Sequence, residues 1–225
     1  ERADVLLCSS QSTLEDCAEY GFSRDRLEHV PLGVVAPMVM TSQDQVKTRY
    51  KLPDEYLLFV GTLEPRKNLS QLIDALEILG DSVPDLVVVG STGWGDVPEA
   101  ENLTSKTKTR VHFAGFVQPS DLGAIYAGAQ VLCYPSLMEG FGLPILEAMS
   151  YGTPVVTSKG SSTQEVSGNA AVLVDPLNIE SIAAGITQAI NHKAELSQLG
   201  RKRASEMTWQ ATAQKTAEVY ERVVQ

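Results

Sequence analysis

Residues 131–147 read VLCYPSLMEGFGLPILE, an apolar run followed by a turn with two glycines and the start of a helical pattern. The apolar run predicts a buried strand, and Pro144 suits the first turn of the helix after it, where a missing N–H costs nothing. Gly140 and Gly142 allow backbone conformations that other residues resist, and they let a ligand approach closely. Because the free N–H groups of a helix start attract anions, the stretch predicts a strand, an anion-binding turn and a helix.

Two carboxylates, Glu139 and Glu147, flank this turn. A carboxylate beside a bound phosphate is poorly placed for the phosphate itself, but it can accept hydrogen bonds from neighbouring hydroxyls of a sugar or a ribose. The alternative is the acid and base pair of a glycosidase. The basic residues described below and the alternation of strands and helices argue against that alternative.

Apolar runs alternate with helical patterns along most of the chain. The predicted strands are residues 56–60, 86–90, 111–114, 130–134, 154–157 and 171–174. Strands that are apolar throughout predict a parallel sheet that is buried on both faces. The predicted fold class is therefore α/β, a Rossmann-like parallel sheet covered by helices on both faces. Residues 1–35 form a separate strand–helix–strand unit, residues 36–45 a linker, and residues 46–225 the Rossmann-like domain.

The composition is that of an ordinary soluble globular protein, with 225 residues and a formal net charge of −10. This charge argues against nucleic acid and anionic lipid as partners. No apolar run approaches the ~18–20 residues that span a membrane, so no transmembrane segment is expected. The cysteines and histidines lack ligand spacing, so we expect reduced thiols, no metal site and a cytoplasmic protein. The chain opens mid-pattern at Glu1, which indicates a fragment or a processed piece.

The sequence GTLEPRKN, residues 61–68, follows the first predicted strand of the Rossmann-like domain. Arg66 and Lys67 come just before a helix N-terminus, which Asn68 can cap. Two cations beside free backbone amides form a phosphate site, and the alternative is a solvated pair of charges. Parallel sheets bind ligands at the carboxyl ends of their strands, so this loop and the turn at residues 139–143 should share one edge. The Gly-x-x-x-x-Gly-Lys-Ser/Thr and Gly-x-Gly-x-x-Gly patterns are both absent.

Residues 139–147, Glu-Gly-Phe-Gly-Leu-Pro-Ile-Leu-Glu, resemble the Glu-x7-Glu motif of the family 4 retaining glycosyltransferases, which have a GT-B fold. Residues 60–68, 115–117 and 209–220 also resemble that family, in the same order. The likeness covers residues 45–225. It implies the C-terminal, donor-binding half of such an enzyme, and residues 1–35 would be the tail end of an N-terminal Rossmann-like domain.

The resemblance implies a site for a nucleotide-diphosphate-sugar donor, without a cofactor or a metal. Arg66 and Lys67 would hold the diphosphate and Glu139 would meet the hydroxyls of the donor sugar; these three are the implied catalytic residues. Glu147 would bind the ribose, and the backbone near Val117 would meet the base. The other implied donor-binding residues lie in the two loops, at Gly61, Thr62, Gly140, Phe141, Gly142 and Leu143.

Thr62 departs from the family pattern, because many members carry an arginine directly after the first glycine of this loop. Arg66 can supply that charge instead, so the division of roles between Arg66 and Lys67 stays open.

In the family the acceptor binds mainly to an N-terminal domain, which residues 1–35 represent only in part. A missing domain or a partner chain is therefore implied. Trp209 and Tyr220 of the last helix either pack on that domain or belong to the core, and we favour the core.

The implied reaction is transfer of a hexose, of mannose or glucose type, to a glycan or a lipid-linked acceptor. The variants at residues 61–68 and 93–95 favour GDP-mannose as the donor, and UDP-glucose is the alternative. A lipid acceptor would place the protein at the membrane surface. Two other functions stay open: a non-catalytic nucleotide-sugar-binding subunit that needs a partner chain, and a sugar-nucleotide epimerase of the same fold.

Three further features have two interpretations each. Trp94 either stacks on a sugar or base or anchors a loop. Glu165 either borders the site or caps a helix. The basic run at residues 201–203 is interpreted as a solvated helix face, with a weak contact to a membrane surface as the alternative.

Overall fold

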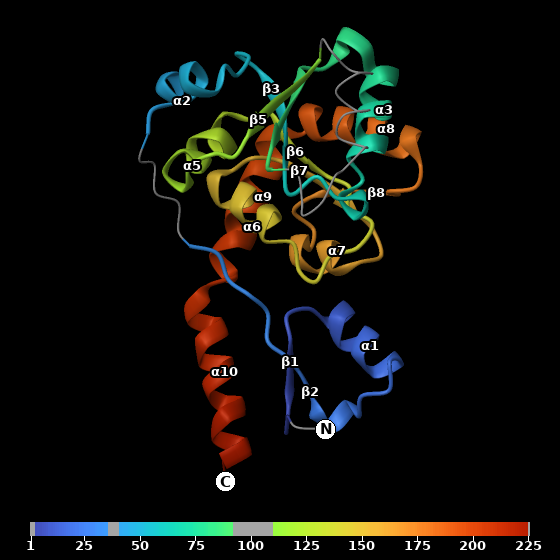
Figure 1. Cartoon of the computed structure of the whole chain (residues 1–225), viewed down its shortest axis with the longest axis vertical. Coiled ribbons are helices and arrows are strands. Elements are labelled where there is room, and N and C mark those ends of the chain that lie inside the picture. The colour runs from blue at the N-terminus through green and yellow to red at the C-terminus, as the bar shows by residue number, and fades with distance from the viewer. Residues whose placement is uncertain (1–2, 36–40, 92–109, 225) are drawn as a thin grey trace.

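The computed structural model of the chain describes residues 3–35, 41–91 and 110–224 (Figure 1). Its larger part is a six-stranded sheet with helices on both sides, which we call the sheet domain. Its smaller part contains residues 3–35, and the long helix α10 (Trp209–Val224) runs beside them. Among the described residues, no helix is both long and apolar enough to cross a membrane.

All six strands of the large sheet are parallel. In chain order they are β3 (Tyr56–Val60), β4 (Asp85–Val89), β5 (Val111–Gly115), β6 (Val131–Tyr134), β7 (Val155–Ser158) and β8 (Val172–Val174). In space their order is β5-β4-β3-β6-β7-β8. The predicted strands and the predicted fold class are therefore confirmed, with strand ends that differ by one residue at most.

The strand order reverses between β3 and β6. The chain runs from β3 outward through β4 to β5, and then returns to pair β6 with the other side of β3, with Leu57 opposite Val131 and Leu58 opposite Leu132. At such a switch point the connections from two neighbouring strands diverge and open a crevice at the carboxyl ends of the strands. The loops that follow β3 and β6 therefore lie side by side.

Helices cover both faces of this sheet. They are α2 (Gln43–Tyr50), α3 (Leu69–Leu79), α5 (Pro119–Gly128), α6 (Leu143–Tyr151), α7 (Ser162–Ser167), α8 (Ile179–Asn191) and α9 (Lys193–Glu206). Short 3-10 turns lie at Pro65–Lys67 and Gly80–Ser82 in this domain, and at Arg24–Arg26 in the smaller part. On one face α3 and α8 share a core with Leu57 and Phe59, and on the other α5 and α6 share a core with Tyr56 and Leu58. Burial on both faces explains why β3 is apolar at every position.

The smaller part combines residues from both ends of the chain. Strands β1 (Leu6–Cys8) and β2 (Leu27–His29) form a two-stranded parallel sheet, and α1 (Gln11–Glu19) connects them. The Thr212 hydroxyl of α10 donates to the Pro31 carbonyl at 2.8 Å, and Arg222 pairs with Glu28 at 2.6 Å. The last helix is thus fastened to the N-terminal segment.

The prediction that Trp209 and Tyr220 belong to the core is wrong. Their exposed fractions are 44% and 63%, and Val219 is the buried residue of α10. The helix extends beyond the sheet domain along the small N-terminal unit (Figure 1). It contacts that unit through the side that carries Thr212 and Val219, which leaves Trp209 and Tyr220 exposed among the described residues.

Two local predictions also need correction. Helix α2 begins inside the stretch interpreted as a linker, where the Ser42 hydroxyl accepts a hydrogen bond from the Gln45 amide. Asn68 precedes α3, but its side chain does not cap that helix. Its amide donates instead to the carbonyls of Pro135 and Pro176, at 3.0 and 2.7 Å, because the loop after β6 lies beside it. Trp94 and residues 93–95 lie outside the described residues.

We expect Gly90→Ala to destabilise the sheet domain. A Cβ atom at position 90 would lie 1.9 Å from the carbonyl oxygen of Gly61, and Gly90 has a φ of +145°, which side chains disfavour. An alanine must therefore push apart the backbones that follow β3 and β4, which we expect to lower the free energy of unfolding by about 2–3 kcal/mol. Denaturant unfolding followed by circular dichroism measures this change.

Gly140→Ala is the matched control for this substitution. A Cβ atom at position 140 meets nothing within 4 Å, and Gly140 is not among the glycines with positive φ. Its free energy of unfolding should stay within about 0.5 kcal/mol of the unsubstituted protein. Equal stability of the two variants would contradict the close approach of Gly90 to Gly61.

Candidate functional site

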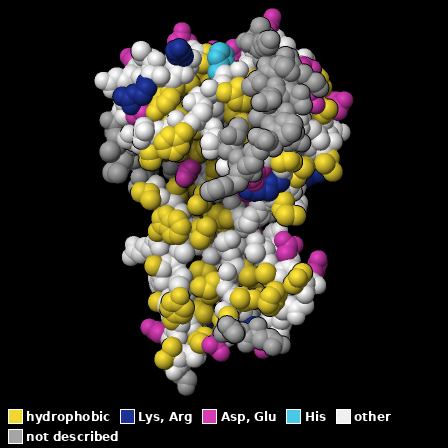
Figure 2. Space-filling model, in the orientation of Figure 1, with side chains coloured by type: hydrophobic (Ala, Val, Ile, Leu, Met, Phe, Trp, Pro, Cys, Tyr) yellow, Lys and Arg dark blue, Asp and Glu magenta, His cyan; other side chains and the backbone are white. Residues whose placement is uncertain are grey.

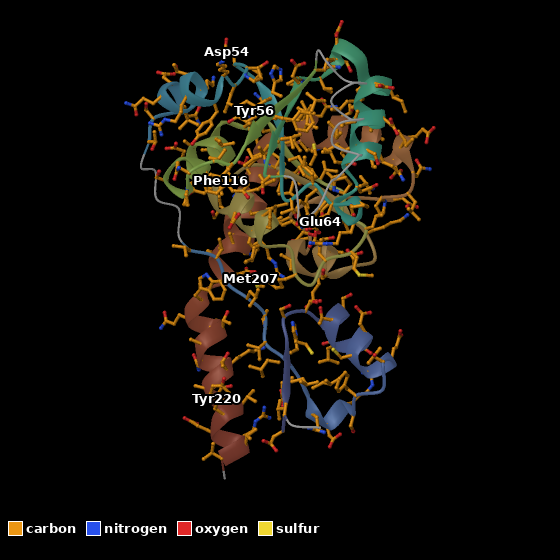
Figure 3. The ribbon with its side chains drawn as sticks, in the orientation of Figure 1. Asp54, Tyr56, Glu64, Phe116, Met207 and Tyr220 are labelled. Carbon is orange, nitrogen blue, oxygen red and sulfur yellow. The ribbon has the colours of Figure 1, made fainter. Side chains whose placement is uncertain are left out.

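The loops after β3 and β6 meet at the edge of the sheet domain that faces the smaller part, where Figure 3 labels Glu64. The Leu137 amide donates to the Arg66 carbonyl at 2.8 Å, which joins the two loops through their backbones. Basic and acidic side chains lie next to one another where the larger part meets the smaller (Figure 2). The two predicted loops therefore share one edge, as their positions after parallel strands indicate.

Lys67 is the most buried cation of this edge, with an exposed fraction of 7%. Its Nζ atom lies 2.6 Å from the Tyr134 hydroxyl and 2.6 Å from Glu139 Oε1. The same nitrogen lies 5.0 Å from the centroid of the Tyr134 ring, within the range of a cation–π contact. The alternative that Lys67 is a solvated charge is excluded.

Glu139 forms ion pairs with both basic residues, Arg66 and Lys67. Its Oε1 accepts hydrogen bonds from Lys67 and, at 2.9 Å, from the Tyr134 hydroxyl, and its Oε2 accepts from Arg66 Nη1 at 2.9 Å. Burial by itself raises the pKa of Glu139, but the hydrogen bond and charge of Lys67, together with Tyr134, outweigh burial and hold this pKa below its usual range. The carboxyl group is therefore ionised at neutral pH.

Tyr134 was not singled out in the sequence, although it ends the strand before the glycine turn. Burial, followed by the charge of Glu139, raises the pKa of its hydroxyl far above the usual range. The hydroxyl therefore stays protonated, so it can accept from Lys67 and donate to Glu139 at once. An apolar run shows that this position is buried, but it does not show that the ring ends in a shared hydrogen bond.

Arg66 lies at the surface of the same cluster and is about half exposed. Its Nε donates to Glu64 Oε2 at 2.7 Å, and its Nη1 also approaches the Met138 carbonyl at 3.3 Å. The Thr62 hydroxyl donates to the other oxygen of Glu64 at 2.8 Å. Gly61 lies under the side chain of Lys67, because a Cβ atom there would be 3.5 Å from Lys67 Cε.

The turn at residues 140–143 joins the cluster to helix α6. Gly142 precedes the helix with a φ of +108°, a backbone conformation that favours glycine over residues with a side chain. Gly140 has no such requirement, which corrects the expectation that both glycines serve an unusual conformation. The Phe141 side chain is buried in the core of the sheet domain, and Leu143 packs against the same core. The N-terminus of α6 points its free amides toward this turn.

Glu147 and Val117 lie apart from the cluster. Glu147 Oε2 accepts a hydrogen bond from the Tyr126 hydroxyl at 2.7 Å. The carboxylate lines a mostly apolar groove of about 480 Å³ between α5 and α6, which Trp209 also borders. Val117 is buried in the core. In the described part of the chain, no hydrogen bond or ion pair links either residue to Arg66, Lys67 or Glu139.

The N-terminal segment reaches the glycine turn directly. The hydroxyls of Ser9, Ser10 and Thr13 approach the Gly140 carbonyl oxygen at 3.0, 2.8 and 3.1 Å. Ser10 also accepts a hydrogen bond from the Thr13 amide and so caps α1. The sequence pattern could not show that the same hydroxyls contact a carbonyl far along the chain.

Glu165 lies in α7, but its side chain caps the N-terminus of α1. Its Oε2 accepts from the Gln11 amide at 2.8 Å, at the start of α1, and its Oε1 lies 3.0 Å from His29 Nε2. Arg203 donates to the Glu165 carbonyl at 2.9 Å. The interpretation of residues 201–203 as a solvated face is therefore wrong for Arg203, because its guanidinium also donates to the Val166 carbonyl of α7 at 2.9 Å.

The arrangement combines two cations, a helix N-terminus and an ionised carboxylate within one edge. Cations and free amides bind phosphate oxygens, and a carboxylate accepts hydrogen bonds from hydroxyl groups. Within the described ranges, no group of three or more His, Cys, Asp and Glu side chains is placed to hold a metal ion.

The chain is similar in sequence to several mannosyltransferases. The O-antigen chain mannosyltransferase B of Escherichia coli is 32% identical over 227 residues, which cover 96% of this chain and 60% of that protein. The MMP alpha-(1->4)-mannosyltransferase of Mycolicibacterium hassiacum is 30% identical over 239 residues, which cover 98% of this chain and 54% of that protein. The chain thus spans a little over half the length of these relatives.

Solved structures show the same fold. HepE of Anabaena, in complex with UDP and glucose, has a TM-score of 0.87 at 21% identity, over 98% of this chain and 64% of that one. The sucrose-phosphate synthase of Thermosynechococcus elongatus has a TM-score of 0.82 at 24% identity, over 100% of this chain and 59% of that one.

A family model described as glycosyl transferases group 1 matches residues 41–206, which is most of the chain. This match confirms the resemblance that the loops after β3 and β6 indicate. The protein belongs to the group 1 glycosyltransferases, and its sheet domain has the architecture of the C-terminal domain of their GT-B fold.

Proposed function

We propose that this chain supplies the nucleotide-sugar donor site of a retaining hexosyltransferase. The observation that carries the proposal is the meeting of Arg66, Lys67 and Glu139 beside the N-terminus of α6. This meeting occurs at the switch point between β3 and β6, where open parallel sheets bind their ligands.

The donor's diphosphate binds Arg66 and Lys67 in this proposal, and Glu139 accepts hydrogen bonds from the sugar hydroxyls. Both cations now contact Glu139, so a diphosphate takes over part of their hydrogen bonding when it binds. The backbone from Gly140 to Leu143 offers amides to the sugar and the phosphates. Gly61 gives the phosphates close access to the loop.

The nucleoside lies next to the phosphates and toward α5. Glu147 accepts hydrogen bonds from the ribose hydroxyls, and its position on the wall of the groove between α5 and α6 supports this role. The backbone near Val117 meets the base, because the loop after β5 opens on the same edge of the sheet. The Tyr126 hydroxyl orients the Glu147 carboxylate through its hydrogen bond to Oε2.

Transfer requires the bond between the sugar and the diphosphate to break, which leaves a growing negative charge on the phosphate oxygens. Arg66, Lys67 and the amides at the start of α6 stabilise that charge more strongly in the transition state than in the bound donor. We propose a mannose- or glucose-type donor, GDP-mannose or UDP-glucose, and a glycan or lipid-linked acceptor. The similarity to two bacterial mannosyltransferases supports mannose, and the similarity to Anabaena HepE, solved in complex with UDP-glucose, supports glucose.

The acceptor side requires a further Rossmann-like unit in this proposal. Within the described residues the parallel sheet of β1 and β2 has two strands, and Leu7 in β1 and Tyr220 in the neighbouring helix α10 expose large apolar side chains. Parallel sheets are normally larger and covered on both faces. We propose that an N-terminal half, from the same protein or a partner chain, completes this sheet and binds the acceptor.

A non-catalytic donor-binding subunit is the rival function. This rival is favoured because the described cluster of Arg66, Lys67 and Glu139 accounts for donor binding and not for acceptor binding.

We expect the chain, when combined with an N-terminal half, to release mannose or glucose from GDP-mannose or UDP-glucose, and we expect Glu139→Gln to abolish this release. Chromatography of the released sugar measures the activity. Tight donor binding without any turnover would favour the rival.

We expect Arg66→Ala and Lys67→Met each to weaken the binding of GDP and UDP by about 10–100-fold. Each substitution removes a charge-assisted contact to phosphate that is worth about 1.5–3 kcal/mol. Isothermal titration calorimetry measures the affinity, and Lys202→Ala, on the exposed face of α9, is the control that should bind like the unsubstituted protein. Unchanged affinity in both variants, with circular dichroism showing a folded protein, would refute the phosphate assignment.

Glu139→Gln should separate the sugar contact from the phosphate contacts. We expect it to remove most of the difference in affinity between GDP-mannose and GDP, or between UDP-glucose and UDP, because an amide replaces the acceptor of the sugar hydroxyls. The affinity for GDP or UDP itself should not fall, since Arg66 and Lys67 lose a competing anion. Glu147→Gln is the contrast, and it should weaken nucleotide and nucleotide sugar equally. A sugar-dependent difference that survives in Glu139→Gln would overturn this role.

A further inference from the structure

The guanidinium of Arg66 is held along two of its edges. Nε donates to Glu64 Oε2 at 2.7 Å, and Nη1 donates to Glu139 Oε2 at 2.9 Å, with the Met138 carbonyl at 3.3 Å. Among the described residues, none accepts a hydrogen bond from Nη2. In the described part of the chain, the Nη2 edge of this planar group is therefore left to donate to a further acceptor.

Glu64 is itself fixed from the other side. The Thr62 hydroxyl donates to Glu64 Oε1 at 2.8 Å, so within the described ranges each carboxylate oxygen has one partner. The loop backbone supports this arrangement, because the Glu64 amide donates to the Thr62 carbonyl and the Lys67 amide donates to the Glu64 carbonyl, both at 2.9 Å. The hydrogen bond from Thr62, and then the charge of Arg66, lower the pKa of Glu64, so it is ionised at neutral pH.

We propose that Glu64, anchored by Thr62, is a positioning residue that orients the Arg66 guanidinium toward a bound diphosphate. The inference rests on the proposed function. It also gives Thr62 an indirect role, as the anchor of Glu64, in place of the direct donor contact that the resemblance implies. Because position 62 carries no arginine, the orientation of the Arg66 guanidinium decides how much of the negative charge of the phosphates it can neutralise.

Arg66 needs Glu64 as a second partner because donor binding weakens its contact with Glu139, the first partner. Glu139 is the residue that accepts from the donor sugar, and its contact with Arg66 weakens as it does so. A half-exposed arginine has several rotatable bonds, and fixing them costs about 2 kcal/mol of side-chain entropy. Glu64 keeps Arg66 in place while Glu139 changes partner. The Glu64–Arg66 pair adds little to stability at its exposed position, so its effect falls on the orientation of the guanidinium.

Charge-preserving variants test this role. Thr62→Val removes the hydroxyl from Glu64, and Glu64→Asp keeps the negative charge but is one methylene too short to bridge Thr62 and Arg66. We expect each to weaken the binding of inorganic pyrophosphate and of GDP or UDP by about 3–10-fold, the size of one hydrogen bond. Thr62→Ser, which keeps the hydroxyl, should bind like the unsubstituted protein. Isothermal titration calorimetry measures all of these affinities, and circular dichroism shows whether each variant is folded.

A double-mutant cycle with Arg66→Ala separates positioning from a role in folding the loop. If Thr62 acts through Arg66, Thr62→Val has no further effect on pyrophosphate affinity once Arg66 is alanine. The same loss in both backgrounds, or no loss in the Thr62→Val single variant, overturns the inference. If Arg66→Ala alone leaves the affinity unchanged, the assignment of Arg66 to the phosphates fails and the inference fails with it, whereas Lys67→Met tests the rest of the phosphate site separately.

Discussion

The parallel pairing of β3 with β6 is the constraint on which the site depends. It is a short contact, with Leu57 opposite Val131 and Leu58 opposite Leu132 in the middle of a buried sheet. The pairing places the ends of two strands side by side although about seventy residues separate them in the chain. Because β4 and β5 lie on one side of β3 and β7 and β8 on the other side of β6, the connections diverge there. The cations of one loop and the carboxylate of the other meet in the crevice that results.

The contact of Arg66 and Lys67 with Glu139 balances opposite charges at a largely buried position, where an unpaired charge would destabilise the fold. Removing a carboxylate or an ammonium group from water costs several kcal/mol, which only a well-placed partner offsets. Glu139 has two cationic partners and a protonated tyrosine, and Lys67 has two oxygen partners and an aromatic ring. A phosphate group can replace Glu139 as the partner of these cations without leaving any of them unpaired. The same network therefore stabilises this edge, and in the proposed function its cations exchange Glu139 for the donor phosphates.

The N-terminal unit is attached to this edge by polar contacts. Three hydroxyls converge on the Gly140 carbonyl, and Glu165 of α7 occupies the N-terminus of α1. Contacts of this polar kind are typical of interfaces between domains of one chain, which are less apolar than a core. The turn that the proposed donor would touch is thus also the point where the smaller part is attached. The position of the smaller part and the conformation of the turn are linked by the same hydrogen bonds.

The sequence by itself determined the strands, the parallel α/β sheet and the meeting of Arg66, Lys67 and Glu139. These follow from apolar runs, and from the rule that parallel strands end at one edge, which are local or general properties. Only the tertiary structure decided that Asn68 serves the loop after β6, that Tyr134 joins the cluster and that Trp209 is exposed. It also decided that Glu165 caps a helix whose first residue lies 154 positions away. The physical reason is that a hydrogen bond requires two atoms within about 3 Å, and periodicity along one segment cannot specify which distant segment arrives there.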